Sequence, residues 1–208
     1  MSKLLHIISQ IISCLLYPLF MPTYGITLFM LAMKERVIAI PDLYLSMSIG
    51  GTFFLSALIP IALILFLWKK GAISSLSIED AQQRTTPYIY TLLCFGFWCA
   101  FIHILRLPKV CFICAIGATA ALLAVTIINQ WWKISAHLTA MGGLFGSICS
   151  IALAYSTLPT TLIIIVLLIS LLLMYARLYL DAHTPMQVIC GYLLGIVCTF
   201  IPNVVLDA

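Results

Sequence analysis

Residues 109–132 read KVCFICAIGATAALLAVTIINQWW, a run in which Lys109 is the only charged residue. About 20 apolar residues in a helix are enough to cross the ~30 Å hydrocarbon core of a bilayer. The whole chain shares this character, since 64% of its 208 residues are hydrophobic, 8% are charged and the mean hydropathy is +1.21. Such values exclude a soluble globular domain and a disordered chain. The long unbroken runs exclude a membrane β-barrel, whose strands alternate apolar and polar residues. The predicted fold class is therefore all-α, a polytopic helical membrane protein.

Outward from this run, the sequence predicts one bundle of six or seven transmembrane helices. Proline marks the start of most apolar runs, where its missing N–H is tolerated. No linker or repeat divides the chain, so residues 34–208 are expected to form a single helical bundle, preceded by an N-terminal membrane segment at 1–33. The clear predicted spans are 43–68, 87–106, 109–132, 137–157, 159–176 and 185–206.

The N-terminal segment is amphipathic over residues 3–17, because apolar side chains recur there at the spacing of one helix face. Pro18 and Pro22 interrupt the apolar stretch that continues to Met33. Two interpretations stay open: one kinked spanning helix, or an interfacial helix followed by a short hairpin segment. A cleaved signal peptide is not favoured, since the prolines fall inside the apolar region. The polar face carries His6, Ser9, Gln10, Ser13 and Tyr17.

The charged residues and the cysteines argue against several other functions. Ten Lys and Arg against six Asp and Glu give a net charge of +4 but form no basic tract, so nucleic-acid binding is not expected. The eight cysteines all lie inside apolar runs, as small buried hydrophobes do. Cys111 and Cys114 have the spacing of a metal or redox pair, but no second pair or nearby His accompanies them. No metal and no other cofactor is predicted.

Three loops are predicted to lie on one membrane face. Two spans separate the polar loop 69–86 from the loop near residue 133, and two more separate that loop from the one near 180. Because two crossings return the chain to its starting side, all three loops share a face. The residues gathered there are Arg84, Lys133, His137, Arg177, Asp181 and His183.

Each of these loops leads into a helix start with a capping residue: Thr86-Pro87, Ser135 and Thr184-Pro185. Helix N-termini present free N–H groups and partial positive charge, and so attract anions. With arginines and imidazoles beside them, these starts indicate a phosphate site with an acid and a nucleophile. The plainer interpretation, that Arg and Lys at span ends reach the interface and His is a satisfied polar group, applies to any one of them alone. His6 and His103 do not belong to this group of residues.

The residues at this face resemble the three motifs of the type-2 phosphatidic acid phosphatase superfamily. Arg177-Leu-Tyr-Leu-Asp-Ala-His183-Thr-Pro185-Met-Gln187-Val188 is similar to the third motif, R, five residues, H-x-P-x-D-V. Ser135-Ala136-His137 resembles the second motif, P-S-G-H, and Gln83-Arg84-Thr-Thr-Pro87 is a loose match to the first, K, six residues, R-P. The resemblance covers roughly residues 70–200.

This resemblance implies a role for each matching residue. His183 would be the nucleophile that takes the phosphoryl group, and His137 the acid that protonates the leaving oxygen. Arg84 and Arg177 would hold the phosphate, assisted by the backbone N–H groups of Ser135 and Ala136. The implied reaction is metal-independent hydrolysis of a phosphomonoester or pyrophosphate through a phosphohistidine, with a lipid phosphate as substrate and membrane lipids as surroundings.

The chain departs from the family pattern at several positions. The Asp that accepts a hydrogen bond from the nucleophile is Gln187, which accepts the same bond but adds no charge. By analogy with the serine-protease triad, losing that charge costs about 10⁴ in rate. Asp181 would substitute only if its loop were extended. Ser77 stands where the first-motif Lys is expected, so Lys133, or else Lys69 or Lys70, would supply that charge. Ala176 replaces the Ser before the third-motif Arg.

Three functions follow as alternatives: an active lipid phosphatase, a catalytically impaired member that binds lipid phosphates, and a lipid transporter. Transporters place charges at mid-bilayer, whereas here the charges sit at span ends. Gly191 and Gly195 predict close helix packing within the bundle or a homodimer face.

The distribution of basic residues gives a weak prediction of orientation. With Arg84, Lys133 and Arg177 set aside as functional, the remaining basic residues favour the opposite face as cytoplasmic. The sequence therefore predicts a multi-pass protein of the cell (inner) membrane with its active site on the extracytoplasmic side. The basic residues of the opposite face are Lys34, Arg36, Arg106 and Lys109.

Overall fold

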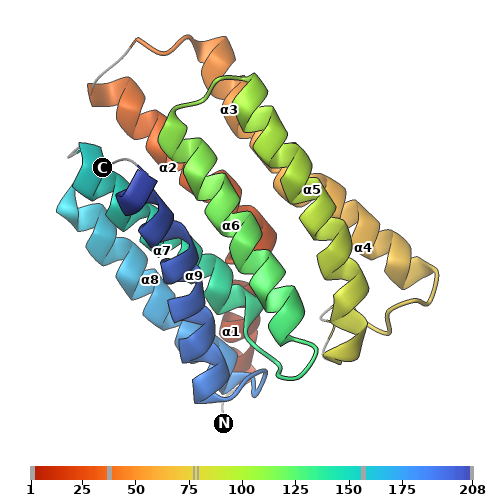
Figure 1. The fold of residues 1–208 in the computed structure, drawn as a ribbon. Helices are drawn as coiled ribbons and strands as arrows, with labels where there is room; N and C mark the ends of the chain where they lie inside the picture. The colour runs from red at the N-terminus through yellow and green to blue at the C-terminus, as the bar shows by residue number, and fades with distance from the viewer. Residues whose placement is uncertain (1–2, 37–38, 77, 79, 156–157, 207–208) are drawn as a thin grey trace.

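The computed structural model describes residues 3–36, 39–76, 78, 80–155 and 158–206, and over these residues the fold is all-α, as predicted (Figure 1). Seven helical segments are long and apolar enough to cross a membrane, so the protein is a multi-pass membrane protein. The helices are α1 Lys3–Leu15, α2 Met21–Arg36, α3 Asp42–Phe53, α4 Ile59–Lys69, α5 Thr85–Ile104, α6 Lys109–Ile128, α7 Ala136–Tyr155, α8 Thr160–Tyr179 and α9 Pro185–Leu206.

The six clear spans are confirmed with small shifts at their ends. The second span, Asp42–Lys69, contains α3 and α4 joined by the π-helical turn Phe54–Leu58. This turn comes just before Pro60, which cannot donate to the helix ladder, and such bulges are a known way to absorb an interruption. The start of α1 and the end of α9 lie at opposite ends of the bundle (Figure 1), as an odd number of crossings requires.

The N-terminal segment is one kinked path, which favours the first of the two interpretations of residues 1–33. A single 3-10 turn, Pro18–Phe20, connects α1 to α2, and the whole segment Lys3–Glu35 qualifies as one candidate span. The Tyr24 hydroxyl donates to the Leu15 carbonyl at 2.9 Å and ties the two helices across the break. In α1, Ser9 and Ser13 are buried, whereas Leu4, Ile11 and Leu15 are exposed. The apolar face of α1 therefore points outward, where a bilayer supplies its apolar surroundings.

The closest helix pair is α7 and α9, which approach through their glycines. A methyl group at Gly195 would collide with the Thr139 carbonyl, and one at Gly142 would collide with the Tyr192 carbonyl. The Thr199 hydroxyl bridges the same pair by donating to the Gly143 carbonyl at 2.9 Å. Small residues that let two backbones meet are typical of packing in membranes. The predicted packing role of the glycines within the bundle is thus confirmed.

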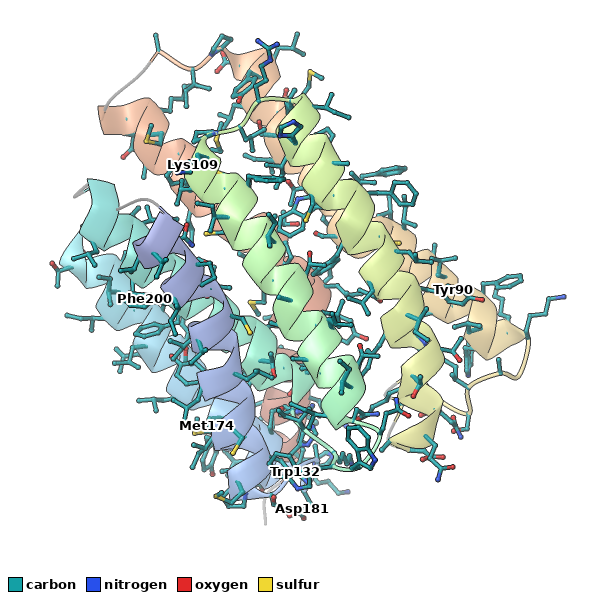
Figure 2. All side chains as sticks on the ribbon, viewed as in Figure 1. Tyr90, Lys109, Trp132, Met174, Asp181 and Phe200 are labelled. Atoms are coloured by element: carbon teal, nitrogen blue, oxygen red, sulfur yellow. The ribbon has the colours of Figure 1, made fainter. Side chains whose placement is uncertain are left out.

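The three loops predicted to share a face do meet at one end of the bundle. The Asn129 amide donates to the Ala81 carbonyl at 2.7 Å, joining the loop after α6 to the loop before α5. The Ser135 N–H donates to the Gln187 carbonyl at 3.3 Å, joining the other two loops. Figure 2 shows Trp132 and Asp181 near each other at this end, with Lys109 toward the other end.

One predicted helix start is wrong. Thr86 does not cap a helix, because the 3-10 turn Gln82–Arg84 continues directly into α5, which begins at Thr85. Arg84 is the N-cap and makes no side-chain capping bond. Pro87 then falls at the third helical position, still within the first turn, where an N–H would lack an intrahelical partner. Pro87 therefore correctly indicated a helix, but the helix begins two residues before the predicted start.

Replacing Gly195 by Ala should destabilise the protein, since the added methyl group meets the backbone of α7 rather than a movable side chain. Overpacking of this kind costs about 1–3 kcal/mol, so the apparent Tm in detergent should fall. Gly96→Ala in α5 is the matched control, because a methyl group there meets nothing within 4 Å. Equal Tm values for the two variants would contradict the close approach of α7 and α9.

Candidate active site

His183 is held by the residues that begin α9. The imidazole Nδ1 lies 3.1 Å from Gln187 Oε1, which also accepts the backbone N–H of Thr184 at 3.1 Å. The Thr184 hydroxyl faces the backbone N–H of Gln187 at 3.5 Å. A threonine at the N-cap and a glutamine three residues later form a capping box, in which each side chain satisfies the other residue's free N–H. Gln187 therefore both starts the helix and positions the histidine.

This arrangement decides which nitrogen of His183 carries the proton. A backbone N–H can only donate, so the atom that Thr184 contacts must be the amide oxygen of Gln187 rather than its nitrogen. That oxygen can only accept, so His183 Nδ1 donates to it. In the neutral imidazole the Nε2 atom then carries the lone pair. Nε2 is the atom available for attack, as the resemblance implies for a nucleophile.

The pKa of His183 lies well below that of a free imidazole. Burial is the largest cause, because the charged form loses its hydration, and the positive charges of Arg177, Arg84 and Lys133 act in the same direction. The hydrogen bond to Gln187 opposes this, and the pKa is lowered from 6.5 to about 4. At neutral pH the side chain is therefore uncharged and its lone pair is free.

Arg84 is a buried cation at the start of α5. Its Nε donates to the Ile78 carbonyl at 2.7 Å, and the backbone of Ile78 takes a left-handed conformation with φ of 43° in the loop before α5. This bond fixes the direction of the guanidinium, which also forms a side-chain hydrogen bond with Tyr88 on α5. Arg84 lines the same cavity as His183.

Arg177 comes from the last turn of α8 and also lines that cavity. Its Nε is buried and has no hydrogen-bond partner among the described residues. A buried donor without a partner costs about 1–3 kcal/mol, so such a group indicates a place kept for a ligand. Ala176, where the family pattern has serine, is fully buried beside it.

The two arginines have no carboxylate counter-ion in the described part of the chain. The one salt bridge between described residues joins Lys34 to Asp42, in the connection from α2 to α3. Lys133 is half-buried and close enough for its charge to act on His183, whereas Lys69 and Lys70 are exposed. Buried charges in proteins are normally paired, so converging cations without an acidic partner form a site for an anion.

His137 also lines the cavity, at the second position of α7. Its Nε2 is 3.2 Å from the Ser13 carbonyl, and its ring meets the Tyr17 ring edge-on, with 5.5 Å between centroids. A carbonyl only accepts, so Nε2 carries a proton and Nδ1 is the second site of this imidazole. The sequence reasoning did not foresee these contacts. Ser13 and Tyr17 on the polar face of residues 3–17 were the available signal, since that face turns toward the bundle.

Two expected contributions, those of Asp181 and of the Ser135 N–H, are placed differently by the structure. Asp181 is exposed in a turn, with φ of 49°, and His183 Nδ1 binds Gln187 instead, so the extended loop that Asp181 needed does not form. The Ser135 N–H is already donated to the Gln187 carbonyl, while its hydroxyl caps α7 through the Leu138 N–H at 3.5 Å. Ala136, the first residue of α7, keeps an N–H without an intrahelical partner. Ser77 lies outside the described residues.

The fold and the site define a multi-pass membrane protein in which a neutral histidine and two arginines line one cavity. Residues 111–206 match the model of the PAP2 superfamily, so the family inferred from the motifs is confirmed. No curated protein and no solved structure matches the chain. The matched segment contains His137, Arg177 and His183. A match to this superfamily indicates phosphatase activity on phosphoesters.

The low pKa of His183 gives a prediction for pH dependence. Since attack needs neutral His183, kcat/KM should fall only as the pH drops toward 4. Gln187→Glu keeps both hydrogen bonds but places a negative charge beside the ring, which raises the pKa of His183 and should shift the acid limb to higher pH. The comparison uses one substrate for both proteins, so ionisation of the phosphate contributes equally. Superimposable acid limbs would contradict the assignment.

The unpartnered Nε of Arg177 gives a second prediction. Arg177→Met removes a half-buried cation whose Nε is buried without a partner, and it keeps an unbranched apolar side chain, so the free energy of unfolding without ligand should rise by about 1 kcal/mol. The same variant should lose the rise in Tm that vanadate or phosphate gives the wild type. Lys109→Met, a basic residue in the first turn of α6, is the control and should keep that response. A lower Tm for Arg177→Met without ligand would show that the guanidinium is satisfied by the protein.

Proposed function

We propose that this protein is a membrane lipid phosphatase that hydrolyses a lipid phosphomonoester or pyrophosphate through a phosphohistidine on His183. The observation that carries the proposal is the tautomer of His183, because it leaves the Nε2 lone pair free in a cavity that two arginines also line, with no counter-ion among the described residues. A neutral nucleophile beside fixed cations suits a substrate that brings two negative charges.

The proposed first step transfers the phosphoryl group to the protein. The Nε2 lone pair of His183 forms a bond to phosphorus, and the bond from phosphorus to the lipid oxygen breaks with its electron pair on that oxygen. His137, protonated at Nδ1 for this step, gives its proton to the leaving oxygen. Arg84, Arg177 and the Ala136 N–H hold the non-bridging oxygens, where charge develops in the transition state.

In the second step water releases the phosphate. The water oxygen attacks phosphorus, the N–P bond breaks and its electron pair returns to Nε2 of His183. His137, now neutral at Nδ1, takes a proton from the water, which returns both histidines to their starting forms. Gln187 holds Nδ1–H throughout, but its amide adds no negative charge to stabilise the phosphorylated ring.

A lipid substrate is favoured by the place of the site. His183, His137 and the two arginines line a cavity inside the bundle whose walls are mostly apolar side chains. Among the described residues, the loops around the site are short and none of them forms a folded domain that could hold a large soluble substrate. A phosphate ester attached to a hydrocarbon fits both parts of the cavity, since it offers an anion to the arginines and an apolar chain to the walls.

The impaired-binder alternative rests on Gln187 and Ala176. Against it, Gln187 keeps the hydrogen bond that fixes the nucleophile, so the missing carboxylate lowers the rate rather than removing the chemistry. The transporter alternative would need charged groups at mid-bilayer, whereas the charged residues of this site lie at helix ends. A slow but active phosphatase accounts for both the retained geometry and the departures.

We further propose that the site lies on the extracytoplasmic face of the cell membrane. Arg106 and Lys109 lie at the opposite end of the bundle from the site, on either side of the short turn between α5 and α6. Lys34 also lies at that end and pairs with Asp42. Basic residues in short loops favour the cytoplasmic side, which supports this orientation.

His183→Ala should abolish phosphate release from lipid phosphates in detergent with a chelator present, by at least about 10³-fold. The wild type should in addition form an acid-labile, base-stable phosphoprotein when quenched during turnover with labelled substrate, and His183→Ala should not. His103→Ala is the matched control, because His103 lies exposed in the last turn of α5, far from the site. Equal phosphate release by wild type and His183→Ala would overturn the proposal.

A further inference from the structure

The cavity at the catalytic histidines continues far beyond the space that a phosphate needs. Along α7 its walls run from Ala136 to Ile151, which is about 22 Å of helix at ~1.5 Å per residue. Along α6 they run from Val125 to Cys111. The cavity therefore extends through roughly two-thirds of the ~30 Å thickness of a hydrocarbon core.

The walls offer nothing polar for a ligand to bind at depth. Away from the histidines and arginines, the few polar side chains on the walls already have partners within the protein. The Trp98 indole donates to Thr52, and the Thr91 and Ser147 hydroxyls donate to carbonyls of their own helices. A deep apolar cavity of this kind stays dry, and a hydrocarbon is its natural occupant.

The size of the cavity matches one hydrocarbon chain. Its volume is about 180 Å³, and one water-sized group needs roughly 10–15 Å³ in the same measure, so about a dozen such groups fit. Protein interiors are otherwise packed with few voids larger than a water molecule. Small residues keep the space open, among them Gly25 on α2 and Ala118 and Ala121 on α6.

We propose that this cavity binds the chain of a single-chain phosphate or pyrophosphate ester, with the head group at His183 and the chain running inward between α2, α5, α6 and α7. The catalytic part rests on the proposed function, whereas the binding part stands on the cavity alone. One slender cavity with one polar end selects a monoalkyl, monoacyl or prenyl phosphate over a phosphatidic acid, whose second chain finds no space.

Ala118→Phe places a ring inside the cavity, about 10 Å along α6 from Val125 and away from the reacting groups. It should lower kcat/KM for hexadecyl phosphate by at least about tenfold, because the end of the chain loses its burial. Butyl phosphate does not reach this depth, so its kcat/KM should change less than about twofold, which also shows that the variant is folded. The wild type should prefer hexadecyl phosphate over phosphatidic acid in the same detergent.

Ala120→Phe is the matched control, since Ala120 is exposed on the outer side of the same helix. It should leave the rates for both alkyl phosphates near those of the wild type. Equal losses for the short and the long substrate in Ala118→Phe, or wild-type hydrolysis of phosphatidic acid as fast as that of hexadecyl phosphate, would overturn the proposal.

A binding measurement separates this proposal from the proposed activity. Trp98 lines the inner part of the cavity and is 2% exposed, so a bromine at the end of a bound chain should quench its fluorescence. The protein used is His183→Ala with Trp68, Trp131 and Trp132 replaced by Phe, which leaves Trp98 as the single tryptophan. Hexadecyl phosphate brominated at its chain end should quench, and excess unbrominated hexadecyl phosphate should reverse the quenching, whereas dihexadecyl phosphate should not.

The outcomes of the two experiments are distinct. Reversible quenching without any phosphate release by the wild type would overturn the proposed activity and leave the chain-binding cavity standing. Phosphate release without reversible quenching of Trp98 would overturn the cavity proposal and leave the activity standing. Reversal by dihexadecyl phosphate as effective as by hexadecyl phosphate would show that the site accepts two chains, which also overturns it.

Discussion

The close contact of α7 with α9 is the constraint on which the rest of the site depends. Glycines bring the two backbones together, and the Ser135 N–H donates to the Gln187 carbonyl across the resulting contact. His137 follows Ser135 by two residues, and His183 comes two residues before α9 begins. One helix contact therefore places both imidazoles at a single cavity. This explains why the smallest residues of the chain cluster in α7 and α9, far from any turn.

The second determinant is charge that the protein leaves uncompensated. Arg84 and Arg177 meet without a carboxylate among the described residues, and Gln187 stands where the family pattern has an acid. An Asp at that position would raise the pKa of His183 and partly neutralise the arginines. With glutamine, the empty site is more positive and its histidine is more firmly neutral, so a phosphate dianion is attracted more strongly. The phosphorylated ring, in turn, is less well stabilised. The substitution thus favours binding over turnover, and the two effects have one cause.

The sequence predicted the parts of this structure that depend on short spacings. Apolar run lengths predicted the spans, the parity of crossings placed three loops at one end, and Thr184 with Gln187 indicated both a helix start and a partner for His183. The predictions that failed concern positions that are set by tertiary contacts. The start of α5 is set by the 3-10 turn that contains Arg84. The Ser135 N–H donates to the carbonyl of Gln187, a residue about fifty positions away in the sequence. Asp181 is directed outward, and its backbone is left-handed. The cavity could not be predicted from the sequence, because it is a space that no side chain fills and no residue pattern marks it.

The N-terminal half of the chain completes a site whose chemistry lies in the C-terminal half. The family match begins at residue 111, yet Arg84, Tyr17 and the Ser13 carbonyl reach the same cavity, and α2 and α5 form much of its apolar wall. Residues that hold a hydrocarbon must fit its shape. Residues that transfer a phosphoryl group must instead fit the phosphate group, which many esters have in common. The cavity-lining residues of α2 and α5 meet only the first of these demands, whereas Arg84, which precedes α5, meets the second. Selectivity among lipid phosphates should therefore be altered by changes in α2 and α5 that leave the histidines and their hydrogen bonds intact.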